Sequence, residues 1–439
     1  MKIRFIRIAA IAISMGIIAA GCSSDSSSPS GTDGSSDTTV ATDTTVATET
    51  SNEWALAYTG ATEGEAAGEP VRVGYVNQES LFPEATIGLM AAVDYTNKEL
   101  SGFGGRPVEI VKCDVAVEED GQKCGTQFAN DPTVSVVLTG TLTVGNASLY
   151  AALDQKKPIV IGNGVTVADF VTKAGVAWTT GSIGVIQGMA KFTIKDLAAK
   201  TVAVIHSNNA AGKAAFDILL KPLFDAAKVT SVGVGVEDTA TATDVQSALQ
   251  AAGADKVDVL LPVVTVQGCS ALYDAIKALG ITPKVVTTGL CFGTPVKTHL
   301  ADIGDKGDFP DGWYFLGYGA SYFNPDVESG MQTYIDKVQQ YGKPAEGSPL
   351  EYTGFAGPLF ANFLTVAKFY QQIGVDAVTP EGFNTAMRAF TGPMMIQAGD
   401  LGCGVAPFIS VCGHVTGIQQ YTTAGGWATI ASIDVRAAG

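Results

Sequence analysis

The stretch that decides the fold is Lys157–Thr166, which reads KPIVIGNGVT. Its apolar run Pro158–Gly162 follows a helical pattern near Asn146–Gln155 and leads into a polar loop with two glycines. Continuous runs of valine and isoleucine between helical crossovers are typical of parallel strands that are covered on both faces. The stretch therefore predicts a strand of a parallel α/β sheet with a polar loop beyond its carboxyl end.

The same alternation extends toward the N-terminus and then restarts after Trp178. In the first unit we expect strands at Val71–Val76, Val108–Cys113 and Val134–Leu138, and helices at Glu84–Leu100 and Glu118–Ala129. In the second unit we expect strands at Thr201–His206, Ser231–Val236, Val257–Val263 and Lys284–Thr288, and helices at Ile183–Leu197, Gly212–Ala227, Thr243–Ala252 and Gly268–Leu279. Two successive doubly wound α/β units follow from this pattern.

The last third of the chain contains too few strands for a third unit of this kind. A strand-like segment at Trp313–Tyr318 precedes three predicted helices, Pro325–Tyr341, Gly354–Ile373 and Thr379–Ala389. The segments Val415–Tyr421 and Trp427–Val435 flank the sequence TAGG, which predicts an antiparallel hairpin. These pieces are expected to complete the first two units, so that the chain crosses between them several times.

The N-terminus has the pattern of a lipoprotein export signal. Basic residues precede the apolar run Ile8–Ala20, which is shorter than the about 20 residues that span a bilayer and fits a cleaved signal peptide. Cys22 after Ala20-Gly21 is then the expected lipidated residue, and an ordinary secreted protein with a stray cysteine is the alternative. We assign residues 1–21 to the signal and 22–69 to a disordered Ser/Thr-rich tether with a lipidated first residue. The protein is therefore expected outside the cell membrane and anchored to it.

The composition restricts the class of protein. The chain is 46% hydrophobic and 16% charged, as expected for a globular protein with a large apolar core. Its net charge of −16 opposes binding to nucleic acid, so none is expected as a partner.

Apart from Cys22, the cysteines form three close pairs in the sequence, which are Cys113 and Cys124, Cys269 and Cys291, and Cys403 and Cys412. Export places them in an oxidising compartment, so three local disulfides are expected among the connectivities that six cysteines allow. A zinc site is the alternative. It is opposed by the lack of a CxxC spacing and by a total of three histidines.

Three polar loops follow predicted strands, where open α/β sheets bind ligands. They are Thr139–Asn146, Gly162–Thr166 and Ser207–Gly212. The first opens a helix, and free backbone N–H groups there would suit a carboxylate or another anion. The alternative is that the glycines only make turns and that the Thr and Asn residues only cap helices.

The order of these segments resembles the leucine/isoleucine/valine-binding protein family, the extracytoplasmic solute receptors of ABC importers. The stretches that carry the resemblance read VRVGYV from Val71, IGLMAAV from Ile87, GFGGRPV from Gly102, KPIVIGNGVT from Lys157 and AVIH from Ala203. The resemblance extends from about Val71 to the C-terminus and rests on order and spacing rather than on any single motif.

The resemblance implies the type 1 periplasmic binding protein fold, in which three hinge crossovers join two Rossmann-like lobes. The hinges are expected near Trp178–Ser182, Gly317–Gly319 and Gly392–Ile396. Lobe 1 would comprise residues 70–180 plus 319–393, and lobe 2 residues 181–318 plus 394–439. The implied partners are a small-molecule ligand and the membrane subunits of an ABC permease.

The resemblance also implies ligand contacts. In lobe 1 these are Thr143 and Asn146 from one loop, Gly164 and Thr166 from the next, and Leu81 or Phe82 from the first. In lobe 2, Asn209 and Phe292 lie in the corresponding loops, and Ala211 stands where the family has an aromatic residue. The tyrosines Tyr318, Tyr322 and Tyr352 either line the cleft or belong to the core and surface.

One departure from the family concerns the ligand's ammonium group. Amino-acid binders place a carboxylate near the segment that reads TTGLCF at residues 287–292, where this chain has no acid. A buried ammonium without an anionic partner is costly. Either Glu79 or Glu351 takes this role, or the ligand is not an α-amino acid.

Enzyme and cofactor motifs are absent from the sequence. No GxSxG elbow, GxGxxG fingerprint or phosphate-binding GxxxxGK loop follows a strand, so we expect no catalytic residue, metal or cofactor. His206 ends a strand on the cleft side, but no nucleophile can be assigned to it. A ligand-sensing receptor subunit of the same fold that signals through a separate membrane protein is the alternative function, and a secreted hydrolase is disfavoured.

Overall fold

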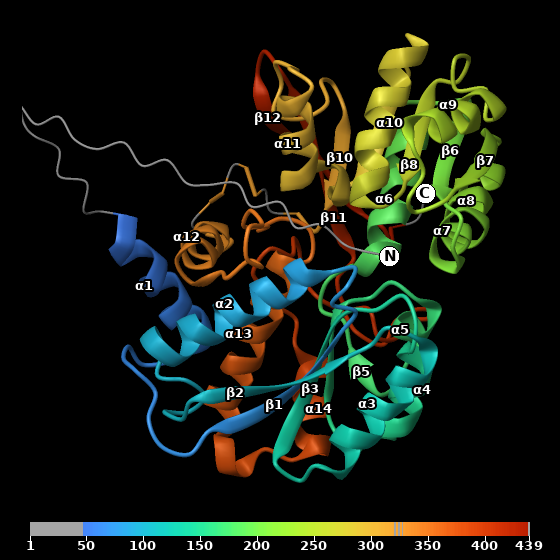
Figure 1. Ribbon diagram of the computed structural model, residues 1–439. Helices are drawn as coiled ribbons and strands as arrows, with labels where there is room; N and C mark the ends of the chain where they lie inside the picture. The colour runs from blue at the N-terminus through green and yellow to red at the C-terminus, as the bar shows by residue number, and fades with distance from the viewer. Residues whose placement is uncertain (1–46, 320–321, 324, 327, 438–439) are drawn as a thin grey trace, which may run out of the picture. The chain divides into compact units, whose positions relative to one another are not determined.

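The computed structural model describes residues 47–319, 322–323, 325–326 and 328–437. Two sheets organise this part of the chain (Figure 1). One has the strand order β2-β1-β3-β4-β5 and the other the order β12-β11-β10-β9-β8-β6-β7. We call the first sheet with its helices lobe 1 and the second sheet with its helices lobe 2. The predicted signal peptide and Cys22 lie outside the described residues.

The sheet of lobe 1 is parallel throughout. Its strands are β1 (Val71–Asn77), β2 (Val108–Asp114), β3 (Val134–Thr141), β4 (Ile159–Asn163) and β5 (Gly175–Val176). In β4, Ile159 and Ile161 enter the hydrophobic cluster on one face, while Val160 enters the cluster on the other. Successive side chains of a strand point to opposite faces, so a run of isoleucine and valine fits a strand with both faces covered. The prediction from Lys157–Thr166 is confirmed.

Helices cover both faces of this sheet. One cluster contains α2 (Pro83–Glu99), α12 (Met331–Tyr341), α13 (Ala356–Ile373) and α14 (Pro380–Ala389), and the other contains α3 (Glu118–Asn130) and α4 (Asn146–Leu153). The short helix α5 (Val167–Val171) follows β4, and a 3₁₀ turn occupies Val375–Ala377. Helices α2 and α13 approach closely at Gly88, where a Cβ atom would lie 2.0 Å from the carbonyl oxygen of Ala356. Lobe 1 therefore takes helices from both ends of the described chain.

The predicted tether is wrong for its second half. Residues Ala47–Thr59 form helix α1, in which Ala55 and Tyr58 are buried. The Tyr58 hydroxyl hydrogen-bonds to the Thr365 hydroxyl on α13 at 2.8 Å, and the Trp54 indole N–H donates to the Glu328 carbonyl at 3.0 Å. These aromatic side chains supply the apolar surface that the Ser/Thr-rich residues before them lack.

The sheet of lobe 2 is parallel except at one edge. Its strands are β6 (Thr201–Ser207), β7 (Thr230–Val236), β8 (Val259–Val263), β9 (Lys284–Thr288), β10 (Tyr314–Gly317), β11 (Val415–Thr422) and β12 (Gly426–Asp434). The last two form the predicted antiparallel hairpin, which adds to β10. A late segment of the chain therefore completes the second sheet.

The helices of lobe 2 also lie on both faces. They are α6 (Gly181–Lys195), α7 (Ala210–Ala214), α8 (Lys221–Ala226), α9 (Ala242–Ala251), α10 (Val266–Leu279) and α11 (Thr294–Asp302). A π-helical turn at Ala215–Leu220 joins α7 to α8, and a 3₁₀ turn occupies Gly289–Phe292. The helix predicted over Gly212–Ala227 is thus interrupted by a π-helical turn.

The chain passes three times between the lobes, and the side chain of Gln397 joins these passages. Its amide oxygen accepts from the backbone N–H of Thr180 at 3.0 Å, and its amide nitrogen donates to the Val415 carbonyl at 2.8 Å. Its backbone forms an isolated bridge with Gly319. Gln397 is buried, so these hydrogen bonds satisfy groups that water does not reach.

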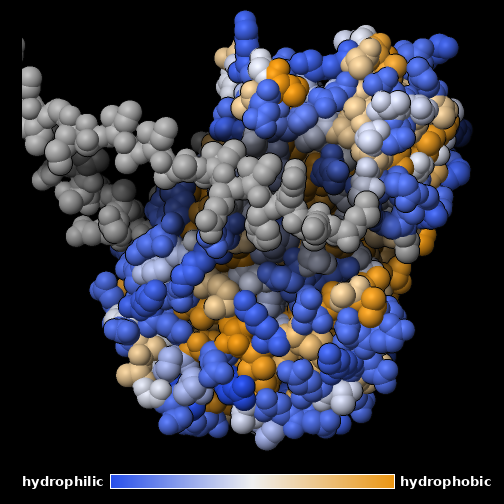
Figure 2. Space-filling view, in the orientation of Figure 1, coloured by the Kyte–Doolittle hydropathy of each residue, from blue (hydrophilic) through white to orange (hydrophobic). Residues whose placement is uncertain are grey.

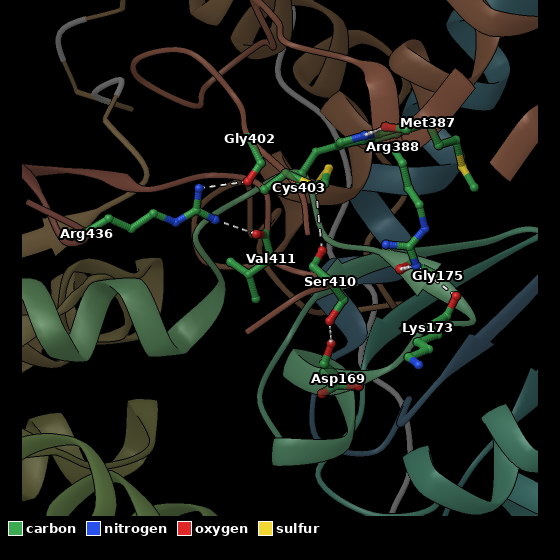
Figure 3. Close-up of a disulfide and its surroundings, with 12 residues drawn as sticks. Asp169, Lys173, Gly175, Met387, Arg388, Gly402, Cys403, Ser410, Val411 and Arg436 are labelled. Carbon is green, nitrogen blue, oxygen red and sulfur yellow. Dashed lines mark hydrogen bonds between the residues drawn. A yellow bond between two sulfur atoms is a disulfide. The ribbon is translucent and has the colours of Figure 1, made fainter. Parts of the chain in front are cut away.

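The three predicted disulfide pairs are present, which excludes a zinc site at these cysteines. Figure 3 shows the surroundings of the Cys403–Cys412 bond. On the lobe 1 side, the Ser410 hydroxyl donates to the Asp169 carbonyl. On the lobe 2 side, the Arg436 guanidinium that follows β12 donates to the carbonyls of Gly402 at 2.7 Å and Val411 at 2.6 Å. The disulfide-closed loop therefore contacts both lobes.

The position of Gln397 leads to a stability prediction. Gln397→Ala leaves the Thr180 N–H and the Val415 carbonyl buried without their partner, so the free energy of unfolding should fall by about 2–3 kcal/mol in urea denaturation. The matched control is Gln122→Ala on the exposed side of α3, which should change it by less than about 0.5 kcal/mol. Equal losses in the two variants would contradict the role given to Gln397.

Candidate functional site

A cavity of about 770 Å³ is lined by residues of both lobes. From lobe 1 it takes the loops after β1, β3 and β4, and from lobe 2 the loops after β6, β7, β8 and β9. These loops all follow the carboxyl ends of parallel strands, where α/β sheets bind ligands. The passages between the lobes add Tyr318, Gly319 and Ile396, and the disulfide-closed loop adds Phe408.

Most of the predicted ligand contacts line this cavity. They are Phe82, Thr143, Thr166, Asn209, Phe292 and Tyr318 from the predicted set, together with Leu81, Ala211 and Tyr322. Asn146, Gly164, Glu351, Glu79 and Tyr352 are not among the lining residues. The structure thus brings the predicted loops together at one cavity, while several of the predicted side chains lie outside its lining.

Asn146 stabilises the loops by hydrogen bonds and does not line the cavity. Its buried amide nitrogen donates to the Asp169 carboxylate at 2.8 Å and to the Leu142 carbonyl at 3.2 Å. The Asp169 carboxylate also accepts from the Tyr150 hydroxyl at 2.5 Å. Burial raises the pKa of Asp169, and the hydrogen bonds from Tyr150 and the loop oppose that rise. Asp169 therefore acts as a buried anchor for the loop after β4.

The two acids proposed for an ammonium group are already bound by protein donors. One Glu351 oxygen accepts from the Thr294 N–H at 2.8 Å, and the other accepts from the Thr353 N–H at 2.8 Å and from its hydroxyl. The Glu79 carboxylate accepts from the Asn77 amide at 2.9 Å and from the Thr86 hydroxyl at 2.5 Å. Neither carboxylate lines the cavity, so the structure does not bring either of them to the candidate site.

The expectation of free N–H groups in the lobe 1 loops is also wrong at the key positions. In the loop after β3, the Thr143 N–H donates to the Gln78 side chain at 3.0 Å, and the Gly145 N–H donates to a Glu118 carboxylate oxygen at 2.7 Å. In the loop after β4, the N–H groups of Val165 and Thr166 both donate to Asp169, at 2.9 and 2.8 Å. These side chains occupy the places that a ligand carboxylate was expected to fill.

Several hydroxyl groups that line the cavity also donate hydrogen bonds to protein acceptors. Six lining hydroxyls donate to protein acceptors: Thr143 to Gln78, Thr166 to Asp169, Ser182 to Gly164, Thr265 to Asp238, Tyr318 to Asn163 and Tyr322 to Gly354. A hydroxyl has one proton and two lone pairs, so each of these groups offers a ligand mainly an acceptor. Burial raises the pKa values of Tyr318 and Tyr322, so both phenols stay protonated near neutral pH.

Several polar residues of the cavity were not predicted from the sequence, among them Glu84 and Thr141. Glu84, in the first turn of α2, lines the wall beside Phe82. Thr141, at the end of β3, is fully buried, and its hydroxyl has no hydrogen-bond partner within the described residues. Pro83 followed by the acid Glu84 is a pattern that marks a helix start, and it comes directly after the loop that follows β1. This pattern was the sequence signal for Glu84.

The charged side chains among the described lining residues of the cavity are all acidic. Its described lining residues include the acids Glu84 and Asp238 but no lysine, arginine or histidine. Burial raises the pKa of Glu84 to about 7, and the negative charges of Glu351 and Glu79 add to the rise. The backbone N–H groups of Glu84 and Phe355 partly oppose it. No basic residue among the described ones forms an ion pair with Glu84.

Most of the remaining wall is apolar, in contrast to the surface. Figure 2 shows hydrophilic side chains over most of the face that it draws. The apolar lining side chains include Leu81, Phe82, Val144, Val165, Phe170, Val185, Ile186, Ile218, Leu290, Phe292, Phe315, Leu316, Phe355 and Phe408. A cavity of this kind, with few polar groups on an apolar wall, is the usual form of a small-molecule site.

His206 does not line the cavity, and its ring stacks on Phe216 while Nδ1 lies 2.9 Å from the Ser207 carbonyl oxygen. No group of three or more His, Cys, Asp or Glu in the described ranges is arranged to hold a metal ion. Of the helices that the structure describes, none has both the length and the hydropathy needed to cross a membrane.

Comparison with known proteins agrees with this geometry. The sequence profile of the family described as "Periplasmic binding protein" matches residues 74–404. A search of curated proteins found no significant match.

Solved structures resemble the fold at low sequence identity. A leucine-binding protein from Thermotoga maritima MSB8 is 14% identical with a TM-score of 0.62, over 83% of this chain and 99% of that one. A solute-binding protein of an R. palustris ABC transporter, solved with 4-hydroxybenzoate, is 18% identical with a TM-score of 0.64, over 83% and 97%. A branched-chain amino acid binding protein from Streptococcus pneumoniae, solved with isoleucine, is 12% identical with a TM-score of 0.62, over 83% and 99%.

The raised pKa of Glu84 leads to a pH prediction. Its pKa is about 7 in the folded protein against an ordinary value of 4.5 for a glutamate, so between these pH values the folded state holds a proton that the unfolded state has lost. Stability must then fall as the pH rises through this window, by up to about 3 kcal/mol for this group. Glu84→Gln should remove this part of the pH dependence and make the protein more stable than wild type at pH about 8.

Urea denaturation of both proteins between pH about 4 and 8 measures this effect. The carboxyls of Glu79 and Glu351 face Glu84, as do the phenols of Tyr75 and Tyr334, whose pKa values burial raises further above the neutral range. The matched control Asp238→Asn, an exposed acid of the same cavity, should keep the wild-type profile. Parallel profiles for wild type and Glu84→Gln would contradict the prediction.

Proposed function

Because the chain belongs to the periplasmic binding protein family, whose members bind solutes and are not enzymes, we propose that it captures a small solute for an ABC importer. The solute is a small polar or amphipathic molecule, in the range of an amino acid, a related carboxylate or an amide. The protein is anchored outside the membrane through a lipid on Cys22 and delivers the solute to the permease subunits. The neighbours that were solved with isoleucine and 4-hydroxybenzoate support this range of ligands.

The cavity that both lobes line is the observation that carries this proposal. A ligand there contacts loops of both lobes, so its binding energy favours the arrangement in which both sets of contacts are made. A ligand shifts a conformational equilibrium only by its differential affinity for the two states. Such a shift gives the permease a feature by which to distinguish the loaded protein from the empty one.

Solution scattering tests the coupling between binding and lobe closure. A thermal-shift screen of amino acids, amines, amides and aliphatic or aromatic acids first identifies a compound that stabilises the protein. This compound should then reduce the radius of gyration, because the lobes close around it. A control compound that gives no thermal shift should leave the scattering unchanged. A radius of gyration that stays unchanged with every stabilising compound would contradict the proposal.

The lipid anchor is tested separately. Cys22→Ser in the full-length chain should move the protein from the membrane fraction into the periplasm or medium, because the thioether-linked lipid can no longer form. The matched control is Cys403→Ser with Cys412→Ser, which should stay with the membrane. Persistent membrane attachment of Cys22→Ser would rule out lipidation at this residue.

A further inference from the structure

Two features that commonly bind an anion, a basic side chain and free N–H groups at Thr143 and Thr166 in the lobe 1 loops, are not found in the described lining of the cavity. No basic side chain is among its described lining residues, and the N–H groups of Thr143 and Thr166 are bound by Gln78 and Asp169. A bare carboxylate in this cavity would therefore face two acids without a compensating cation. Burying a charge without a partner is costly.

The same cavity is well supplied with acceptors. The hydroxyls of Thr143, Tyr318 and Tyr322 donate hydrogen bonds to protein oxygens, so their lone pairs can accept from a ligand. The Thr166 hydroxyl donates to Asp169 and also accepts from its N–H. Thr141 adds a buried hydroxyl that has no partner in the described structure. Acceptors in a cavity whose partly buried acid has no ion-pair partner in the described structure are suited to a ligand that donates hydrogen bonds and carries positive charge.

The two acids of the cavity differ in what they can contribute. Asp238 is exposed, and both of its carboxylate oxygens accept from the Asn209 amide, at 3.2 and 3.0 Å. An exposed ion pair contributes little, because water and salt screen it. Glu84 is partly buried in the first turn of α2, where a cation gains more from the pairing.

Aromatic side chains line the cavity together with Glu84. Phe82 and Phe355 form an edge-to-face pair with ring centroids 5.3 Å apart, and both line the cavity with Glu84. The Tyr322 hydroxyl donates to the Gly354 carbonyl at 3.1 Å, and an added Cβ on Gly354 would lie 3.7 Å from a Glu84 carboxylate oxygen. An acid next to aromatic faces attracts a nitrogen cation both by charge and by cation–π contact.

We propose that the ligand carries a protonated nitrogen that pairs with Glu84 beside Phe82, Phe355 and Tyr322, while its apolar body lies against the wall of the cavity. This inference rests on the proposed function and narrows its ligand range to amines and amino acids over nitrogen-free acids. It places the cation partner in lobe 1, at the start of α2, rather than in the segment at residues 287–292.

Calorimetry with matched probes tests the inference. Phenethylamine, L-phenylalanine and hydrocinnamate share one apolar body and differ in their charged groups, and isoamylamine, L-leucine and isocaproate form a second set. The nitrogen-bearing members should bind at pH about 8, and hydrocinnamate and isocaproate should bind at least about 10-fold more weakly. Glu84→Gln should weaken the nitrogen-bearing probes at least about 10-fold.

Two further variants control for indirect effects. Glu84→Asp keeps the charge and should retain more affinity for the nitrogen-bearing probes than Glu84→Gln does. Glu119→Gln removes an exposed acid of α3 that does not line the cavity, and it should stay within about 2-fold of wild type. Thermal denaturation of each variant shows that it is folded.

The outcomes separate this inference from the proposed function. Binding of hydrocinnamate or isocaproate in preference to the nitrogen-bearing probes would overturn the inference and leave the proposed function standing. Unchanged affinity of Glu84→Gln for a nitrogen-bearing probe would overturn the role of Glu84 alone. If nothing in the wider thermal-shift screen binds, the proposed function fails and the inference fails with it.

Discussion

The hydrogen bonds of Gln397 are the constraint on which the two-lobed structure depends. One buried side chain contacts the first passage through Thr180 and the start of β11 through Val415, and its backbone bridges to Gly319 in the second passage. The three connections are therefore held at one place. The cavity walls come from strand ends that are attached directly to these connections, since Tyr318 and Ile396 belong both to the passages and to the lining.

The cavity owes its chemistry to side chains behind its wall. The N–H groups of the two lobe 1 loops donate hydrogen bonds to Gln78, Glu118 and Asp169. These N–H groups are therefore not available to bind an anion. The groups that stabilise the loops thereby also set the polarity that a solute meets. The negative charge of the described cavity lining follows from this arrangement. It does not follow from the overall charge of −16, because most acids lie outside the cavity.

Local patterns predicted much of the fold. The Ile/Val run at 159–161, the hairpin around TAGG and the three cysteine pairs depend on neighbours in the sequence, and the structure confirms them. The loops of the site were also found, because strand ends fix their place. The roles of Asn146, Glu351 and Glu84 could not be found, because each depends on a partner far away in the sequence: Asp169, Thr294 and Phe355. Helix α1 was missed because Trp54 and Tyr58 are stabilised by residues near the other end of the chain.

The attachment of α1 to lobe 1 has a consequence for the distance that the protein can reach from the cell membrane. An unattached segment from Cys22 to residue 69 would allow a span of at most about 170 Å at full extension. Because Ala47–Thr59 is bound to lobe 1, a lipid on Cys22, as proposed above, would be separated from the folded protein by at most about 90 Å of extended chain. A connection with half the maximum span would confine the protein to a thinner layer above the bilayer. Its local concentration at a transporter in that bilayer would then be higher.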